Sequence, residues 1–302
     1  MKRHSYIAIL VIGILGLLPT WAQDTAEAPL RLTLPSEFYA VPGVETGIYF
    51  DNIVLTETPE AYRFSVTCDL GASEERRWTA TPTAAQVGAH TLSVTVADAA
   101  GAVLGRAQTT LKVIPANAGA KSSIKLLIVG DSLTHATVYP KEIGRLLASP
   151  DNPTWRMLGT NTRGGESQGV FHEGYGGWTW NRFATKYEPN PDGTYKKRSS
   201  PFIFLGPDDK PALDVARYYD ENTKGERPDV ITILLGINDC FGAKPDDPAN
   251  IDARIDTMFG YAKTLIEAFR KTAPDAEIGI CLTPPGNSRE SGFFANYKGK
   301  YT

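Results

Sequence analysis

Cysteine and histidine are scarce in this chain, and each scarcity excludes a class of protein. The 302 residues include only 3 Cys and 4 His. Three cysteines cannot form the disulfide framework of a small secreted domain, and Cys68, Cys240 and Cys281 lack the spacing of zinc ligands. Charge is nearly balanced, with a net charge of −3. That balance excludes a protein that binds nucleic acid through a large basic excess. We therefore expect no metal site and no nucleic-acid partner.

Long apolar runs are also missing, except near the N-terminus. Residues 2–4 are basic, and Tyr6–Leu18 is uninterrupted by polar side chains. This run is shorter than the ~20 residues that a membrane span needs, and Pro19 ends it. Ala22 offers a small-residue cleavage site. Residues 1–22 therefore predict a signal peptide, and we expect a secreted or periplasmic protein with no membrane span after cleavage. An uncleaved membrane anchor is the alternative.

Residues 27–115 show the alternation of a β-sandwich. In 62–69 and in 91–96, apolar side chains alternate with polar ones. Successive side chains of a strand point to opposite faces, so each run has one buried and one wet face. Turn residues such as Gly101 separate the runs, which is typical of an immunoglobulin-like fold. The small and polar residues 116–123 predict a linker.

From residue 124 to residue 302 the pattern changes to strands that alternate with helices. We expect an α/β domain with a doubly wound parallel sheet, whose ligands bind at the carboxyl ends of the strands. The expected strands are Ile124–Val129, Trp155–Leu158, Val230–Leu235 and Ala276–Leu282, and the expected helices are Pro140–Ser149 and Ile251–Thr272.

Three short motifs follow strands of this domain. Gly130–Thr134 reads GDSLT, His172–Thr179 reads HEGYGGWT, and Gly236–Asp239 reads GIND. Each alone is explained by ordinary turn or helix-cap chemistry. Together they offer a serine hydroxyl, a glycine N–H and an asparagine amide at one edge of a sheet. Acyl transfer through a tetrahedral intermediate needs such a nucleophile with oxyanion donors.

With these motifs in this order, the domain resembles the SGNH hydrolase superfamily, also called GDSL esterases or lipases, which has a flavodoxin-like sheet. The resemblance covers about 124–285. It implies that Ser132 is the nucleophile and donates its own N–H, that Gly177 donates its N–H, and that Asn238 donates its side-chain amide. Gly176 is the alternative to Gly177. No metal or organic cofactor is implied. The neighbouring candidates for substrate contact are Asp131, His135, His172, Trp178 and Asp239.

One part of the family pattern is missing. The family's catalytic acid and base come from a C-terminal D-x-x-H block, but no histidine follows His172. We expect that the chain is a C-terminally truncated version of a longer protein; the alternative is a degenerate member that binds without cleaving. A general base must lie within hydrogen-bond reach of the serine. His135 and His172 are weaker candidates for that role.

Two further features leave alternatives open. The connection 187–227 is long for this fold and rich in aromatic residues. It either shapes a substrate pocket or packs on its own aromatics. Cys240 and Cys281 both follow strands and could form a disulfide or remain free thiols.

The sequence thus predicts an exported serine esterase that forms an acyl-enzyme on Ser132. The expected substrate is an acyl or acetyl ester on a carbohydrate, because an exported SGNH domain beside a sandwich resembles carbohydrate esterases. The rival hypothesis is a non-catalytic protein that binds a glycan or a surface.

Overall fold

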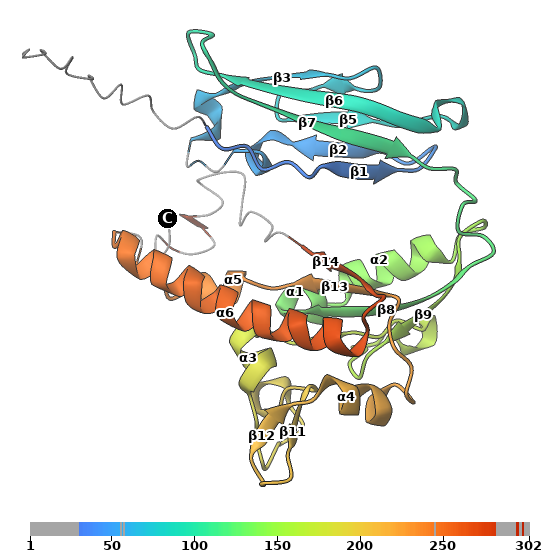
Figure 1. Cartoon of the computed structure of the whole chain (residues 1–302), viewed down its shortest axis with the longest axis vertical. Coiled ribbons are helices and arrows are strands. Elements are labelled where there is room, and N and C mark those ends of the chain that lie inside the picture. The colour runs from blue at the N-terminus through green and yellow to red at the C-terminus, as the bar shows by residue number, and fades with distance from the viewer. Residues whose placement is uncertain are drawn as a thin grey trace, which may run out of the picture. The chain divides into compact units, whose positions relative to one another are not determined.

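The computed structural model of the chain describes residues 30–281 apart from 55, 57 and 245, together with 294, 295 and 298. The predicted signal peptide (1–22) lies outside these residues, as does the predicted strand end at Leu282. The chain divides into two compact units between Pro115 and Ala116 (Figure 1). Among the described residues, no helix has both the length and the apolar character that crossing a membrane requires.

The N-terminal unit consists of two β-sheets around one core. One sheet has the order β1-β7-β6-β3 and the other β2-β5-β4. On β6, Leu92, Val94 and Val96 are buried and alternate with more exposed residues, so the predicted period of two is confirmed. Trp78 of the other sheet fills the same core. The elements are β1 (Glu37–Ala40), β2 (Thr46–Tyr49), η1 (Phe50–Asn52), η2 (Pro59–Ala61), β3 (Arg63–Thr67), β4 (Ala72–Ser73), β5 (Arg77–Ala80), η3 (Ala84–Gln86), β6 (Gly88–Ala97) and β7 (Val103–Val113).

The C-terminal unit is a mixed α/β domain with a parallel sheet, as expected. Its elements are β8 (Ser123–Gly130), α1 (Ser132–His135), α2 (Val138–Leu147), β9 (Thr154–Leu158), η4 (Glu166–Gln168), β10 (Glu173–Gly174), α3 (Trp180–Thr185), η5 (Tyr195–Lys197), β11 (Ile203–Leu205), β12 (Pro211–Leu213), α4 (Val215–Asn222), β13 (Val230–Leu234), α5 (Ile237–Cys240), α6 (Pro248–Thr272) and β14 (Glu277–Ile280).

The sheet is organised around β8. Strand β13 pairs with one edge of β8 and carries β14 on its far side. The other edge of β8 is shared: β9 pairs with its first part, up to Leu127, and β10 pairs with Val129 and Gly130. All these pairings are parallel. The glycine-rich motif His172–Thr179 therefore contains the short strand β10, which the sequence analysis does not predict, and does not directly follow β9.

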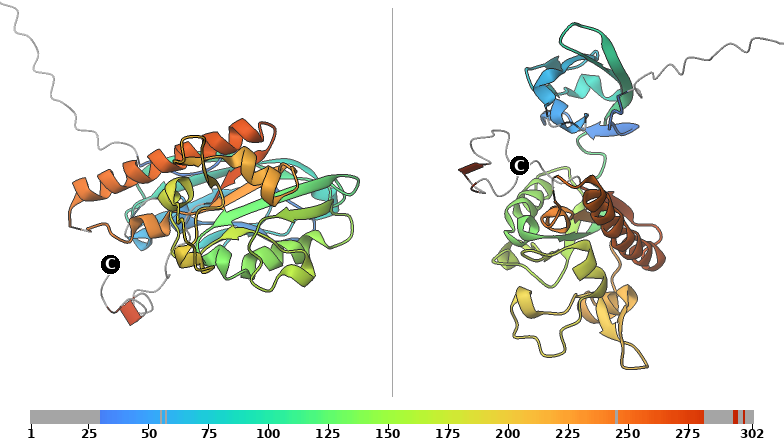
Figure 2. Two further views of the ribbon diagram at one scale, coloured as in Figure 1. Left: turned by 90° about the horizontal axis from the view of Figure 1, so that it is seen from below. Right: turned by 90° about the vertical axis from the view of Figure 1, so that its left-hand side faces the viewer.

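Helices cover both faces of this sheet. Leu126 and Ile128 of β8 pack toward α2, whereas Leu127 and Val129 pack with α3, α4 and α6. Figure 2 shows α2 in green and α6 in red-orange on opposite sides of the strands. Alternate residues of β8 serve the two faces, which explains why its sequence is a nearly continuous apolar run.

Three helix boundaries differ from the prediction, one of them the end of α2, which lies at Leu147 and not at Ser149. Helix α2 begins at Val138, two residues before Pro140, because the first turn of a helix tolerates proline. Helix α6 begins at Pro248, since the Asp247 carboxylate caps it by accepting a hydrogen bond from the backbone N–H of Asn250.

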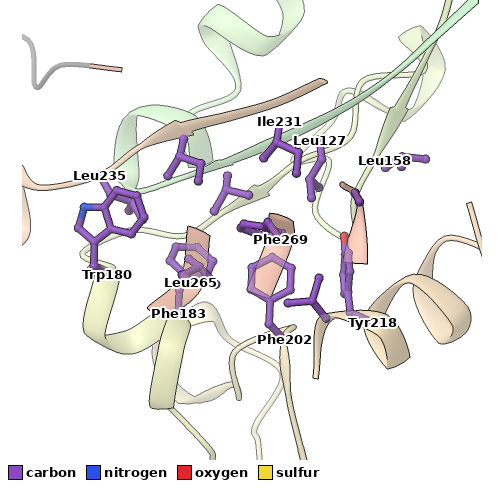
Figure 3. Packing of buried hydrophobic residues seen from close by; sticks show 14 of the residues in the cluster. Leu127, Leu158, Trp180, Phe183, Phe202, Tyr218, Ile231, Leu235, Leu265 and Phe269 are labelled. Carbon is purple, nitrogen blue, oxygen red and sulfur yellow. The ribbon is translucent and has the colours of Figure 1, made fainter. Parts of the chain in front are cut away.

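The long connection 187–227 is folded into the domain. It contains the β11–β12 hairpin and α4. Phe202 and Tyr218 from this segment pack in the core beneath the sheet (Figure 3). The rings of Phe202 and Phe269 meet edge to face, with their centroids 5.1 Å apart. The aromatic residues of this segment thus pack on one another, since the centroids of the Phe202 and Tyr218 rings lie 4.8 Å apart, and they also join the core of the domain.

Candidate functional site

The first predicted motif turns sharply at the end of β8. Asp131 is buried and caps α1, its Oδ1 accepting a hydrogen bond from the Leu133 N–H at 3.0 Å. Ser132 is the first residue of that helix, and its side chain is exposed. Gly130 is required before this turn, because a Cβ there would lie 1.9 Å from the Thr134 hydroxyl.

Asn238 of α5 ties the three motifs together. Its Nδ2 donates to Asp131 Oδ2 at 3.3 Å and to the Trp178 carbonyl at 3.0 Å. The next residue also links α5 to the segment after the glycine-rich motif, since Asp239 Oδ2 accepts a hydrogen bond from the Trp180 N–H at 3.4 Å. The ends of β8, β10 and β13 therefore meet at one place, as expected for parallel strands.

The backbone of Gly177 is exposed where these strand ends meet. It adopts a left-handed conformation with φ +73, which favours glycine. Its carbonyl accepts a hydrogen bond from Arg182 Nη1 at 2.9 Å. Across the described part of the chain, the N–H groups of Gly177 and Ser132 have no hydrogen-bond partner. Both are therefore available to an oxygen of a ligand.

Gly176 serves a different purpose from Gly177. A Cβ at Gly176 would lie 3.0 Å from the Tyr195 ring, whereas at Gly177 the nearest atom is 3.9 Å away. Gly176 thus lets Tyr195 pack closely, and Gly177 remains the open position.

Asp239 and Asp131 are carboxyl groups removed from water. Burial raises the pKa of Asp131, although the Leu133 N–H opposes that effect. Burial likewise raises the pKa of Asp239 to about 6. Asp239 is only half-buried, so it remains a candidate for substrate contact.

His135 points toward the glycine loop. Its Nδ1 lies 3.2 Å from the Gly174 carbonyl and 3.1 Å from Asn161 Nδ2. Its ring packs against that of Tyr195, with centroids 4.7 Å apart. Burial lowers the pKa of His135. No hydrogen bond within the described residues joins His135 to Ser132, so this geometry does not make His135 the base.

His172 is a structural residue. It is fully buried; its Nδ1 accepts from the Gly174 N–H at 3.1 Å and its Nε2 lies 3.0 Å from Thr137 Oγ1. Because Nδ1 accepts, the proton sits on Nε2 and is donated to the Thr137 hydroxyl. Burial lowers the pKa of His172 to about 4, so the ring is neutral at pH 7.

Three of the predicted substrate contacts lie in the interior of the unit. His172, Asp131 and Trp178 are at most 1% exposed. Each is also engaged by protein groups; the Trp178 indole, for example, donates from Nε1 to the Tyr195 carbonyl at 3.0 Å. Their side chains therefore leave almost no surface open to a ligand.

Glu173 is a buried carboxyl group that the sequence pattern did not single out. It accepts hydrogen bonds from the Thr160 N–H at 2.8 Å, the Thr160 hydroxyl at 3.1 Å and the Tyr218 hydroxyl at 2.7 Å, and also from the Tyr175 hydroxyl. Burial raises its pKa. Its position just before a glycine-rich turn was the one available signal, and that signal does not distinguish a buried from an exposed carboxyl.

The described part of the structure contains neither a cluster that could hold a metal ion nor a disulfide bond. No group of three or more His, Cys, Asp or Glu side chains there is placed to hold a metal ion. Cys68, Cys240 and Cys281 are free, and the latter two are exposed.

Comparisons with known proteins leave the family open. No protein-family model matches the chain, and no curated protein matches it. Among solved structures, it is similar to fibronectin(III)-like modules of Clostridium thermocellum CbhA, with 18% identity over 28% of this chain and 96% of the other and a TM-score of 0.21. An endo-fucoidan hydrolase from glycoside hydrolase family 107 matches 27% of the chain at 12% identity and a TM-score of 0.21, with 13% of its own length covered. A sialyltransferase from Photobacterium damsela matches 80% of the chain at 10% identity and a TM-score of 0.23, with 50% of its own length covered. These scores are too low to carry an argument about fold or function.

Proposed function

We propose that the chain is an SGNH-type serine esterase that hydrolyses acyl or acetyl esters of carbohydrates. On this proposal the C-terminal unit is a doubly wound, flavodoxin-like domain, and the N-terminal unit is an immunoglobulin-like sandwich. The observation that carries the proposal is the Asn238 amide. Its contacts with Asp131 and with the Trp178 carbonyl gather the three motifs around the exposed Ser132 and Gly177.

The proposed reaction has two steps. The Ser132 hydroxyl loses its proton to a base as its oxygen bonds to the ester carbonyl carbon, which becomes tetrahedral. The N–H groups of Ser132 and Gly177 hold the resulting oxyanion. Collapse breaks the bond to the alcohol, which leaves as it takes up a proton, and water then hydrolyses the acyl-enzyme. The role of the base is assigned to none of the described residues.

Asn238 is the third oxyanion donor on this proposal. Both hydrogens of its amide are engaged, one on the Trp178 carbonyl at 3.0 Å and one on Asp131 at 3.3 Å. The longer of these bonds is the weaker. We expect the amide to keep the bond to Trp178 and to turn its other hydrogen from Asp131 toward the oxyanion.

The carbohydrate substrate is supported by the groups beside Gly177. The rings of His135 and Tyr195 pack together there, both partly exposed, and the Asn161 amide lies against His135. Aromatic faces with amide groups suit a sugar ring, which has both apolar C–H faces and hydroxyls.

A second function, glycan binding without hydrolysis, is favoured by a separate observation. The described histidines of this unit are both committed elsewhere, His135 to Gly174 and Asn161, and His172 to Gly174 and Thr137. Without a base, a serine hydroxyl stays protonated and is a poor nucleophile at neutral pH.

The test is hydrolysis of 4-nitrophenyl acetate, together with labelling by a fluorophosphonate and peptide mapping of the labelled residue. We expect Ser132→Ala to abolish both hydrolysis and labelling. The matched control is Ser149→Ala, an exposed serine at the end of α2, which should change neither. Labelling of another residue, or turnover that survives Ser132→Ala, would refute the assignment. An unlabelled chain that still binds acetylated xylo-oligosaccharides would favour the second function.

A further inference from the structure

A cavity of about 430 Å³ lies within the folded connection 187–227 and is distinct from the Ser132 site. This volume falls within the range of small-molecule sites, roughly 300–1,000 Å³. The cavity is formed mainly by this connection, together with one residue that follows β9. The lining residues that matter here are Thr160, Arg198, Ser199, Phe204, Glu221 and Asn222.

Arg198 is the unusual member of this lining. Its guanidinium carbon lies 4.7 Å from the centroid of the buried Tyr175 ring, and its side chain is partly buried. Within the described residues it makes no ion pair and donates no hydrogen bond, whereas Arg156, Arg217 and Arg227 of the same unit each pair with a carboxylate. The Tyr175 ring and the charge of the buried Glu173 carboxyl attract this cation, but the N–H donors of the guanidinium bond to no oxygen of the described residues. These donors point to an external anion.

The nearby carboxyl groups do not fill this role. Glu173 lies behind the Tyr175 hydroxyl, fully buried, and already accepts hydrogen bonds from Thr160 and from Tyr175. Glu221 stands in the cavity wall but accepts a hydrogen bond from Arg217 at 2.6 Å. Neither is hydrogen-bonded to the Arg198 guanidinium.

The other polar groups of the wall separate into two kinds. The hydroxyls of Ser199 and Thr160 donate to protein groups, to the Glu188 carbonyl and to Glu173. The Asn222 amide is exposed, and its side chain has no hydrogen bond in the described part of the chain. The cavity therefore offers one guanidinium and one amide that lack hydrogen-bond partners among the described residues, beside the ring of Phe204.

We propose that this cavity binds a sugar carboxylate of the uronic acid class, with its carboxylate on Arg198 and its hydroxyls on Asn222. A guanidinium donates two parallel hydrogen bonds to a planar carboxylate, and the amide can both donate to and accept from hydroxyls. The carboxylate of Glu221 in the wall disfavours a dianion such as phosphate more than a monoanion. The proposal does not depend on the chemistry of Ser132.

The test is isothermal titration of the purified whole chain with D-glucuronate. D-glucose serves as the uncharged probe, acetate as the probe without hydroxyls, and inorganic phosphate as the dianion. We expect glucuronate to bind at least tenfold more tightly than any of the three. Failure of glucuronate to bind, or equal or tighter binding of glucose, acetate or phosphate, would overturn the proposal.

Variants assign the binding to this cavity. We expect Arg198→Gln to weaken glucuronate binding at least tenfold, as for the loss of a charged hydrogen-bond partner. Arg145→Gln removes the same charge from an exposed ion pair on α2 and should leave the affinity unchanged. Because Arg198 packs on Tyr175 and its loss could disturb the fold, Asn222→Ala at an exposed position is the second variant, with an expected loss of threefold or more. Unchanged affinity in either cavity variant contradicts the assignment.

Discussion

Replacing Glu173 by alanine should strongly destabilise the C-terminal unit. The carboxyl accepts hydrogen bonds from the N–H and hydroxyl of Thr160 and from the hydroxyls of Tyr175 and Tyr218. Both tyrosines are 0% exposed, so bulk water does not reach their hydroxyls. Each orphaned buried donor costs about 1–3 kcal/mol, which gives about 2–6 kcal/mol for the two tyrosines. The cavity left by the side chain adds to this cost.

Glu173→Gln keeps the size and shape of the side chain but removes its ability to ionise. Its amide oxygen can accept from Thr160 and Tyr218, while its NH₂ group donates to hydroxyls that can rotate. Burial raises the pKa of Glu173 from 4.5 in the folded protein, so the unfolded chain ionises first as pH rises. The unfolded state then binds fewer protons, and stability falls with pH between the unfolded and folded pKa values, by at most about 1.4 kcal/mol per unit. The glutamine variant should lack this fall.

The assay is urea unfolding followed by tryptophan fluorescence at several pH values between 4 and 8. Glu166→Gln, at an exposed position, is the matched control and should follow the wild type. An alanine variant within about 1 kcal/mol of the wild type would show that the four hydrogen bonds do not hold the loop. A glutamine variant with the same pH dependence as the wild type would refute the raised pKa.

Three further changes test the candidate site. Asn238→Ala should lower kcat by on the order of 10²–10³ with little change in KM, as for a donor used in the transition state; an effect confined to KM would mean that it only binds substrate. His172→Ala should lower the free energy of unfolding by about 1–3 kcal/mol, because the Gly174 N–H loses its acceptor, and leave the pH–rate profile unmoved; a shifted profile would show a role in proton transfer. Gly174→Ala should destabilise by about 1–3 kcal/mol, since its Cβ would lie 2.5 Å from Thr134 Cγ2 and 2.8 Å from the His135 nitrogen; a Tm equal to that of the wild type would contradict this packing.

The strands of the parallel sheet were predictable because burial on both faces makes them continuous apolar runs. The run Ile124–Val129 became β8, with one residue more at each end, and Val230–Leu235 became β13, one residue shorter. Strand β10 was not predictable, because two residues carry no periodicity. The hairpin β11–β12 was hidden for a similar reason: its three-residue strands stand among turn residues.

The sequence predicted which segments meet at the site better than it predicted which side chains face outward. Residues at parallel strand ends must converge, so Ser132, Gly177 and Asn238 were placed correctly at one edge. The polarity of a side chain, however, does not indicate whether it is buried or exposed. His172 and Trp178 carry polar atoms and yet lie in the interior, because backbone and hydroxyl groups satisfy those atoms there.

The bonds that tie the motifs together also constrain how the molecule folds. Asn238 reaches Asp131 across 107 positions of the chain and Trp178 across 60. Contacts of such separation form only after long loops have closed, and they slow folding. A chain emerging from the ribosome carries the serine turn and the glycine loop well before the segment that fixes them. The serine environment is therefore completed late, when β13 docks against β8, and an incompletely folded molecule has the motifs without the site.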